Sequence, residues 1–318
     1  MFPPPLNIDM QTLQHLRTQF SHMLKNFTSS PSSTFRILHT IPSTATQHTP
    51  AIRTLYVLDS SFNPPSKAHL SLVQTALESS SQNAISSSGR NSRQVQSQNP
   101  RVLFLLATIN ADKTPEPADF EDRLVMMTLM AEQLRSNFSS NDPPAAAPPV
   151  IDIGVTKEPY FIDKARSIDE SNIYNTPSES GRREVIEQIH LTGFDTLIRI
   201  FTPKYYPNYT PPLSALAPFL ARHRLRATIR PDPAVEFSTV EAQKAYFARI
   251  AKGEMEGEGL KREWVDRVEL VLDETGEAEG VSSTRVREAV KKGDWEVVKE
   301  LVGEGVQAWI REKGLYLE

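Results

Sequence analysis

Ser66 and His69, in the segment SFNPPSKAH, are the residues of this chain best suited to chemistry. The segment follows an apolar run, residues 55–58, with the pattern of a strand buried on both faces of a parallel sheet. Turn-forming residues come next, and residues 67–78 have helical spacing, which puts His69 in a first helical turn. Backbone N–H groups there lack intrahelical partners and carry the positive end of the helix dipole. The pattern therefore predicts a phosphate site beside an imidazole.

A second segment, VSSTRVR, has the same character near the other end of the chain. A strand pattern over residues 268–272 leads through a polar loop to a helix that ends near residue 292. Three preferred cap residues open that helix: Ser282, Ser283 and Thr284. Arg285 and Arg287 follow in its first turn, where positive charge opposes the dipole unless an anion is bound. This segment predicts a second anion site.

Each segment alone also fits an ordinary structural role. A histidine near a helix start is more often structural than catalytic, and serine and threonine cap helices of every kind. The presence of both segments in one chain is what favours phosphate chemistry.

Together the segments resemble the two signatures of the HxGH nucleotidylyltransferases, GSFNPxHxGH and ISSTxxR. The eukaryotic nicotinamide mononucleotide (NMN) adenylyltransferases, and their fungal relatives above all, look most similar. They carry a hydroxyl residue where the first His would stand, and this chain has Ser66. Two positions depart from the pattern, because Ser60 and Ala68 stand where the family has Gly.

The resemblance extends over residues 55–316. The segment ending at Lys113 and the segment EDRLVMM are similar to the family's lysine loop and HRxxM helix. Gly193-Phe194-Asp195 is similar to its GxD element, and RATIRP, which contains Arg230, to a later strand and its arginine.

This resemblance implies transfer of AMP from ATP, which carries Mg²⁺, to NMN, with NAD and pyrophosphate as products. It implies three catalytic residues: His69 as donor to the α-phosphate, Ser66 as a phosphate contact, and Arg287 on the β- and γ-phosphates. The implied ATP-binding residues are Ser61, Phe62, Asn63, Lys113, Gly193, Asp195, Ser282, Ser283 and Thr284. On the nicotinamide side the candidates are Tyr160 and Phe161, in place of a missing tryptophan, and Arg230.

Composition excludes several other classes of function. The 318 residues include no cysteine, so disulfides, thiolate zinc sites and cysteine nucleophiles are excluded. A net charge of −4 without a basic stripe argues against a nucleic-acid partner, and no apolar run approaches the roughly 20 residues of a membrane span. The P-loop, GxGxxG and GxSxG signatures are missing, and no His or carboxylate spacing predicts a protein metal site.

The order of elements predicts an α/β, Rossmann-like parallel sheet with helices on both faces and a short C-terminal helical tail. The predicted strands are residues 55–58, 102–107, 150–155, 196–200, 226–229 and 268–272. The predicted helices before the tail are residues 68–77, 121–134, 181–189 and 240–251. Residues 1–50 are expected to form a helix and a Ser/Thr/Pro-rich tether, and residues 51–318 a nucleotidylyltransferase domain with disordered inserts near 79–100 and 136–149.

Two alternative functions stay open at this point. The chain could adenylylate a different phosphorylated acceptor, or it could bind or hydrolyse ATP and act through a protein partner. The expected location is the cytoplasm or nucleus. The acid-poor, amphipathic start of the chain also fits a mitochondrial transit peptide, although a helix packed on the domain is preferred. A homo-oligomer is left open.

Overall fold

The structure is a computed structural model, and it describes residues 9–46, 52–87, 100–109, 118–139, 148–177, 183–231, 237–273 and 280–318. The predicted ATP contact Lys113 lies outside these residues.

The described elements fall into strands, α-helices and short 3-10 helices. The strands are β1 (Phe35–Ile41), β2 (Thr54–Asp59), β3 (Arg101–Ala107), β4 (Val150–Thr156), β5 (Thr176–Pro177), β6 (Arg183–Glu184), β7 (Glu187–Gly193), β8 (Arg224–Ile229) and β9 (Val268–Leu272). The α-helices are α1 (Met10–Ser29), α2 (Lys67–Ser87), α3 (Phe120–Ser139), α4 (Phe161–Glu170), α5 (Phe194–Ile200), α6 (Ala217–Leu220), α7 (Val240–Ala251), α8 (Ser283–Lys291), α9 (Trp295–Leu301) and α10 (Glu304–Lys313). The 3-10 helices are η1 (Ser43–Thr46), η2 (Pro203–Tyr205), η3 (Pro212–Leu216), η4 (Glu256–Glu258) and η5 (Arg262–Arg267).

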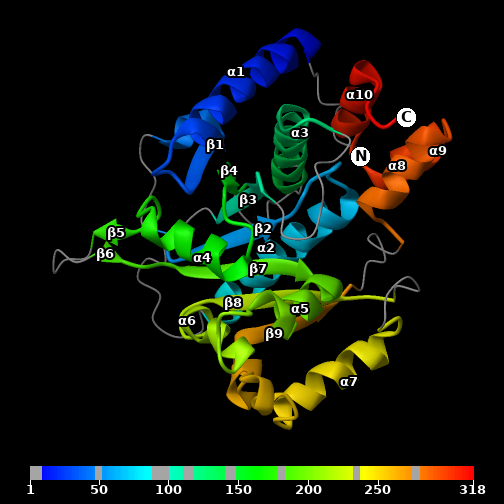
Figure 1. The fold of residues 1–318 in the computed structure, drawn as a ribbon. Helices are drawn as coiled ribbons and strands as arrows, with labels where there is room; N and C mark the ends of the chain where they lie inside the picture. The colour runs from blue at the N-terminus through cyan, green and yellow to red at the C-terminus, as the bar shows by residue number, and fades with distance from the viewer. Residues whose placement is uncertain are drawn as a thin grey trace.

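The main sheet has the order β1-β4-β3-β2-β7-β8-β9, and every pair is parallel except β1 with β4. From β2 the chain first builds outward through β3 and β4, then returns to build the other half through β7, β8 and β9 (Figure 1). This is the doubly wound α/β arrangement, whose ligands bind beyond the carboxyl ends of the strands at the switch between the halves. The predicted fold class is confirmed, and the switch lies between β2 and β7.

Side-chain alternation along β2 divides the core into two layers. Tyr56 and Leu58 pack in one core with α1, α2, α3 and the C-terminal helices. Leu55 and Val57 face the opposite side, in a core that includes Ile168 of α4. Figure 1 shows the same division, with α1, α3 and α8–α10 on one side of the sheet and α4–α6 on the other. Because successive strand residues point to opposite faces, the side chains at the end of β2 also point alternately to the two layers.

The N-terminal helix packs on the domain, as the preferred interpretation predicts. Leu13, Phe20, Leu24 and Phe27 of α1 are buried in the core that includes α3. The stretch predicted as a tether instead contains β1, which joins the sheet edge beside β4. The helices α2 and α3 also continue to Ser87 and Ser139, inside the two stretches predicted as disordered inserts, so those predictions are wrong over the helical residues.

Two predicted elements between β4 and β8 are wrong. The predicted helix at residues 181–189 is replaced by β6 and the start of β7, and the predicted strand at residues 196–200 lies in α5. β7 was hard to identify because one of its faces carries buried polar side chains, Gln188, His190 and Thr192, in place of an apolar row. Tertiary contacts supply hydrogen-bond partners for Gln188 and for one ring nitrogen of His190, and the local sequence gives no sign of these contacts.

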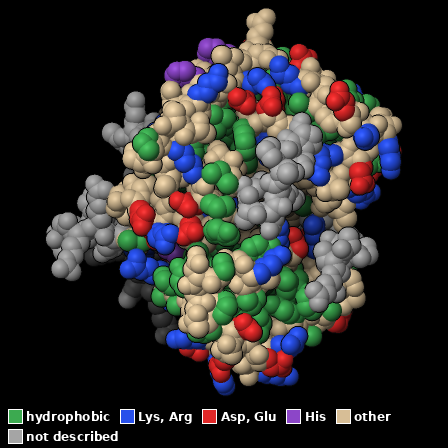
Figure 2. Space-filling model, in the orientation of Figure 1, with side chains coloured by type: hydrophobic (Ala, Val, Ile, Leu, Met, Phe, Trp, Pro, Cys, Tyr) green, Lys and Arg blue, Asp and Glu red, His purple; other side chains and the backbone are tan. Residues whose placement is uncertain are grey.

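The described surface carries both signs of charge. On the face shown in Figure 2, lysine and arginine side chains are interspersed with aspartate and glutamate, with apolar side chains gathered between them. Among the described helices, none is long and apolar enough to cross a membrane.

Candidate active site

The two phosphate segments predicted from the sequence meet in the structure. Ser283 Oγ donates to the carbonyl of Pro64 at 2.8 Å, and Arg287 Nη1 donates to the carbonyl of Asn63 at 2.7 Å. These bonds tie the first turns of α8 to the turn that follows β2. The site therefore lies at the carboxyl end of β2, beside the switch point.

The turn itself is held from several directions. Phe62 has a φ of 45°, in the left-handed region that costs roughly 1–2 kcal/mol for a residue with a Cβ. Its ring is buried and packs against His69 at 5.4 Å and Phe104 at 5.9 Å between ring centroids. Asn63 Oδ1 accepts a hydrogen bond from the Tyr316 hydroxyl at 2.7 Å, and both side chains are buried. Since the Phe62 side chain is enclosed, only its backbone is available for the predicted ATP contact.

Local hydrogen bonds set the tautomer of His69. Ser66 directly precedes α2, and its backbone N–H donates to His69 Nδ1 at 3.0 Å, while its Oγ lies 2.9 Å from the same nitrogen. In return the His69 N–H donates to the Ser66 carbonyl, so the pair forms a reciprocal helix cap. A backbone N–H can only donate, so Nδ1 carries no proton. The neutral ring therefore keeps its proton on Nε2, which lies 2.9 Å from Ser60 Oγ.

The surroundings of His69 keep it neutral. Burial, with the positive charge of Arg230, lowers the pKa of His69 to about 4. Arg230 Nη2 donates to the carbonyl of Val281, directly before the SSTR segment, at 3.3 Å. The structure thus places Arg230 beside His69 and the start of α8, and its nicotinamide-side role stays a prediction.

The start of α8 keeps a positive field. Ser282 Oγ accepts from the Arg285 N–H at 3.2 Å as the N-cap, and Thr284 Oγ1 accepts from Arg287 Nη2 at 3.2 Å. Neither α2 nor α8 has an acidic residue in its first turn. Two helix starts, with Arg285 and Arg287 in the first turns of α8, suit a polyphosphate.

The GxD element lies on the other side of the switch point, at the end of β7. Gly193 is the N-cap of α5 and Asp195 is exposed in its first turn. A Cβ on Gly193 would lie 2.7 Å from Asp195 Oδ1. The glycine therefore leaves room for the carboxylate of Asp195. Ser61, the remaining predicted ATP contact, is partly exposed directly after Ser60.

The two aromatic candidates on the acceptor side differ in the structure. Tyr160 is the N-cap of α4 and is 40% exposed. Phe161 contacts His190 and Phe219 edge to face, at 4.9 Å in each case, and so belongs to the core. Of the two residues, Tyr160 is the more exposed.

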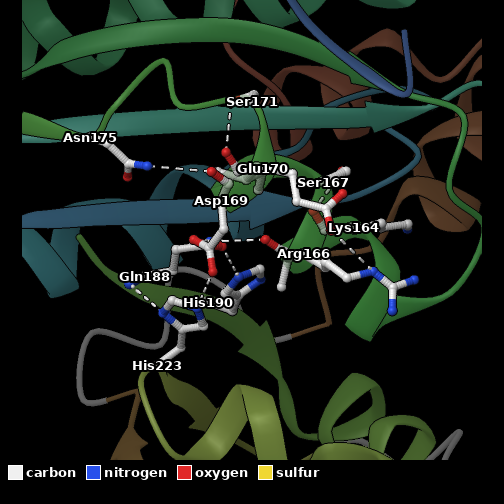
Figure 3. Close-up of polar contacts among 12 residues, drawn as sticks. Lys164, Arg166, Ser167, Asp169, Glu170, Ser171, Asn175, Gln188, His190 and His223 are labelled. Atoms are coloured by element: carbon white, nitrogen blue, oxygen red, sulfur yellow. Dashed lines mark hydrogen bonds and ion pairs between the residues drawn. The ribbon is translucent and has the colours of Figure 1, made fainter. Parts of the chain in front are cut away.

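On the face of β7 toward α4 the side chains are polar, and they form a hydrogen-bonded network with Asp169 of α4 (Figure 3). Gln188 Nε2 donates to Asp169 Oδ1 at 2.6 Å, and Gln188 Oε1 lies 2.9 Å from His190 Nε2. His223 Nε2 lies 3.0 Å from Asp169 Oδ2. Burial, with nearby positive groups, lowers the pKa of His190 well below its usual value. Across the described residues no group of His, Cys, Asp or Glu could hold a metal ion.

Sequence reasoning missed three contributors to this site. Ser60 was read only as a departure from glycine, yet its hydroxyl meets His69. Tyr316 reaches the turn from the end of the chain, and Asp59 pairs with Lys164 beside it. One signal in the sequence pointed to these contributors, the hydroxyl residue Ser60 directly before the SFNP segment.

Comparison with known proteins gives the family. No protein-family model matches the chain. A curated protein of Schizosaccharomyces pombe (strain 972 / ATCC 24843), named "Putative nicotinamide mononucleotide adenylyltransferase", is 30% identical over 248 residues, which are 78% of this chain and 80% of that protein. Two solved structures of a Plasmodium falciparum nicotinic acid mononucleotide adenylyltransferase, complexed with NaAD and with APC, match 83% of this chain and 98% of theirs, at 14% and 12% identity and TM-scores of 0.49 and 0.48. On the strength of the S. pombe relative, this chain belongs to the nicotinamide mononucleotide adenylyltransferase family.

Proposed function

We propose that the chain transfers the AMP moiety of ATP to NMN, forming NAD and pyrophosphate. Family membership supports an adenylyltransferase of the nicotinate or nicotinamide mononucleotide type. The observation that carries the proposal is the meeting of the two phosphate segments around a neutral His69 with its proton on Nε2.

The reaction needs positioning and charge neutralisation more than covalent chemistry. A phosphate oxygen of NMN attacks the α-phosphorus of ATP, the bond from that phosphorus to the bridging α–β oxygen breaks, and pyrophosphate leaves with the electron pair. ATP enters with its Mg²⁺ as the substrate complex. Holding the two anions in line can supply roughly 7–11 kcal/mol of the barrier.

Each side chain has a stated role in this proposal. His69 donates its Nε2–H to a nonbridging α-phosphate oxygen as charge develops there. Ser66 fixes the ring by accepting and donating at the α2 cap. Arg287 and the start of α8 hold the β- and γ-phosphates, and Asp195 accepts from a ribose hydroxyl.

The test is NAD formation from ATP, Mg²⁺ and NMN by the purified protein, His69→Ala and a control, His22→Ala. His22 is exposed on α1, far along the chain from both phosphate segments. We expect NAD and pyrophosphate in equal amounts, a fall in kcat of about 10²–10⁴-fold for His69→Ala, and no change for His22→Ala. If ATP is lost at the same rate with and without NMN and no NAD forms, the proposal is contradicted and an ATP-dependent role with a protein partner is favoured. Transfer of AMP to another phosphorylated compound and not to NMN would mean that this compound is the acceptor.

A further inference from the structure

One ion pair beside the turn has no part in the mechanism so far. Lys164 Nζ lies 2.7 Å from Asp59 Oδ2, and the two side chains are 11% and 20% exposed. Asp59 ends β2, directly before Ser60, and Lys164 lies in the first turn of α4. The pair is therefore held at the carboxyl edge of the sheet, next to the proposed reaction centre.

The pair lies on the opposite side of β2 from His69. Ser60 turns its hydroxyl toward His69 on α2, whereas Asp59 is bound to α4. Leu55 and Val57 share the Asp59 side of the strand, in the core that contains Ile168 of α4. The end of β2 thus separates a side that carries the phosphate groups from a side formed by α4.

The α4 side also offers a surface for a ring. Tyr160 lies one helical turn before Lys164, since the Lys164 N–H donates to the Tyr160 carbonyl at 3.1 Å, and both residues are on one face of the helix. An exposed aromatic side chain and a fixed ion pair one turn apart suit a flat heterocycle that carries a polar substituent.

A buried polar atom on the same side lacks a partner. Val57 pairs with His190, so Asp59 and Thr192 come at the same level two residues further along β2 and β7. Thr192 is 7% exposed, and its Oγ1 has no hydrogen-bond partner in the described structure. Buried polar atoms normally find a partner, and a ligand group or a bound water at this edge would supply one.

We propose that Asp59 and Lys164 bind the carboxamide of the acceptor's pyridine ring and select it over the corresponding carboxylate. This inference rests on the proposed function. The amide oxygen accepts from Lys164, and the amide NH₂ donates to Asp59. Within the described residues neither side chain has another polar partner, so Lys164 keeps two N–H groups and Asp59 keeps Oδ1 for a ligand. A carboxylate at the same place would face Asp59, and like charges in a partly buried site repel.

The pairing also argues against a phosphate as the ligand of Lys164. A lysine that served a dianionic phosphate would gain from a free positive charge, whereas this lysine is neutralised at 2.7 Å by a fixed carboxylate. A neutral pair that both donates and accepts matches a neutral amide.

The test compares kcat/KM for NMN and for nicotinic acid mononucleotide at saturating MgATP. Asp59→Asn removes the repelling charge and leaves Lys164 positive, so the preference for NMN should fall about 10- to 100-fold. Lys164→Met should increase the preference for NMN, because Asp59 then repels the carboxylate of the acid with no lysine beside it to attract that carboxylate. The control is Glu187→Gln, which removes the exposed pair with Arg224 at the opposite end of β7 and should leave the ratio unchanged.

Because Lys164→Met leaves a half-buried carboxylate without its partner, the double variant Asp59→Asn with Lys164→Gln is measured as well. It keeps a neutral pair and should fold like wild type while losing most of the discrimination.

The outcomes separate this inference from the proposed function. If wild type forms NAD but the acceptor ratio of Asp59→Asn stays within about twofold of wild type, the inference is wrong and the transferase stands. A wild-type preference for the acid also overturns the inference. Transfer to neither acceptor overturns both proposals.

Discussion

The hydroxyl of Tyr316 offers a sharp test of how the turn after β2 is held. It donates to Asn63 Oδ1 at 2.7 Å, across 253 positions of sequence, and both side chains are buried. Burial raises the pKa of Tyr316, so the group stays a neutral donor at all ordinary pH values. Tyr316→Phe keeps the ring and removes this donor alone.

The size of the effect follows from the geometry. The substitution leaves a buried amide oxygen without its partner, which costs about 1–3 kcal/mol. In a domain of this size that lowers Tm by roughly 2–4 °C for each kcal/mol. The turn also carries Phe62 in a left-handed conformation and aligns His69, so part of the loss should appear in catalysis. The upper limit for kcat/KM is a fall of about 5- to 150-fold.

The assay pairs thermal unfolding with the NAD-forming rate, and Tyr209→Phe is the matched control. Tyr209 is 41% exposed and its hydroxyl has no polar partner within the described residues, so its variant should match wild type. A double-mutant cycle with Asn63→Ala should show a coupling of the same size as the single loss. If Tyr316→Phe unfolds and turns over like wild type, the bond does not hold the turn and this reasoning is refuted.

Four further predictions concern the same region. By NMR, His69 should titrate near pH 4 in the free protein and at a higher pH with ATP bound, and a midpoint near 6.5 would contradict the buried environment. Because the folded pKa lies below the unfolded value of 6.5, the contribution of His69 to stability is complete above pH 6.5 and is lost as the pH falls toward 4. Gly193→Ala should push the Asp195 carboxylate aside without unfolding the chain and raise KM for ATP about 10- to 100-fold, and an unchanged KM would remove Asp195 from the ATP site. Ser60→Gly should keep kcat within about tenfold of wild type, and a loss as large as that of His69→Ala would make the hydroxyl a participant in the chemistry. Asp122→Ala should cost about 1–3 kcal/mol in denaturant unfolding, because it removes the bonds of a buried carboxylate to the partly exposed Arg17 and leaves the buried Trp309 N–H without its partner, and an unchanged free energy of unfolding would contradict that account.

The sequence predicted the parts of this fold whose signals are local. Apolar runs such as 102–107 and 150–155 indicated buried parallel strands, and the caps of VSSTRVR indicated a helix start, which the structure confirms in β3, β4 and α8. The family resemblance implies that the two phosphate segments contact one ATP and so share one site. Their direct bonds, from Ser283 and Arg287 to the turn, confirm that they meet.

The remaining features depend on tertiary contacts that leave no local pattern. β7 carries Gln188 and His190 on a buried face, where Gln188 bonds to α4 and to His190 Nε2, so hydrophobic periodicity could not reveal a strand. β1 lies in a stretch rich in serine and threonine and becomes a strand by pairing with β4. Tyr316 is separated from Asn63 by almost the whole domain, and no spacing rule connects them.

The chemistry of Ser60 shows how a departure from the family pattern can be accommodated at the reaction centre. In the free protein His69 Nε2 and Ser60 Oγ lie 2.9 Å apart. The neutral ring has a single N–H, so it cannot donate fully to both Ser60 and an α-phosphate oxygen. In the proposed reaction, the α-phosphate of ATP takes over that hydrogen, which would leave the Ser60 hydroxyl free to rotate and donate to the same phosphate. A glycine at this position has no hydroxyl and could not hydrogen-bond to the imidazole in the free protein. The serine therefore exchanges one neutral hydrogen bond before binding for a charge-assisted one afterwards, which favours the anion and leaves the orientation of His69 to Ser66.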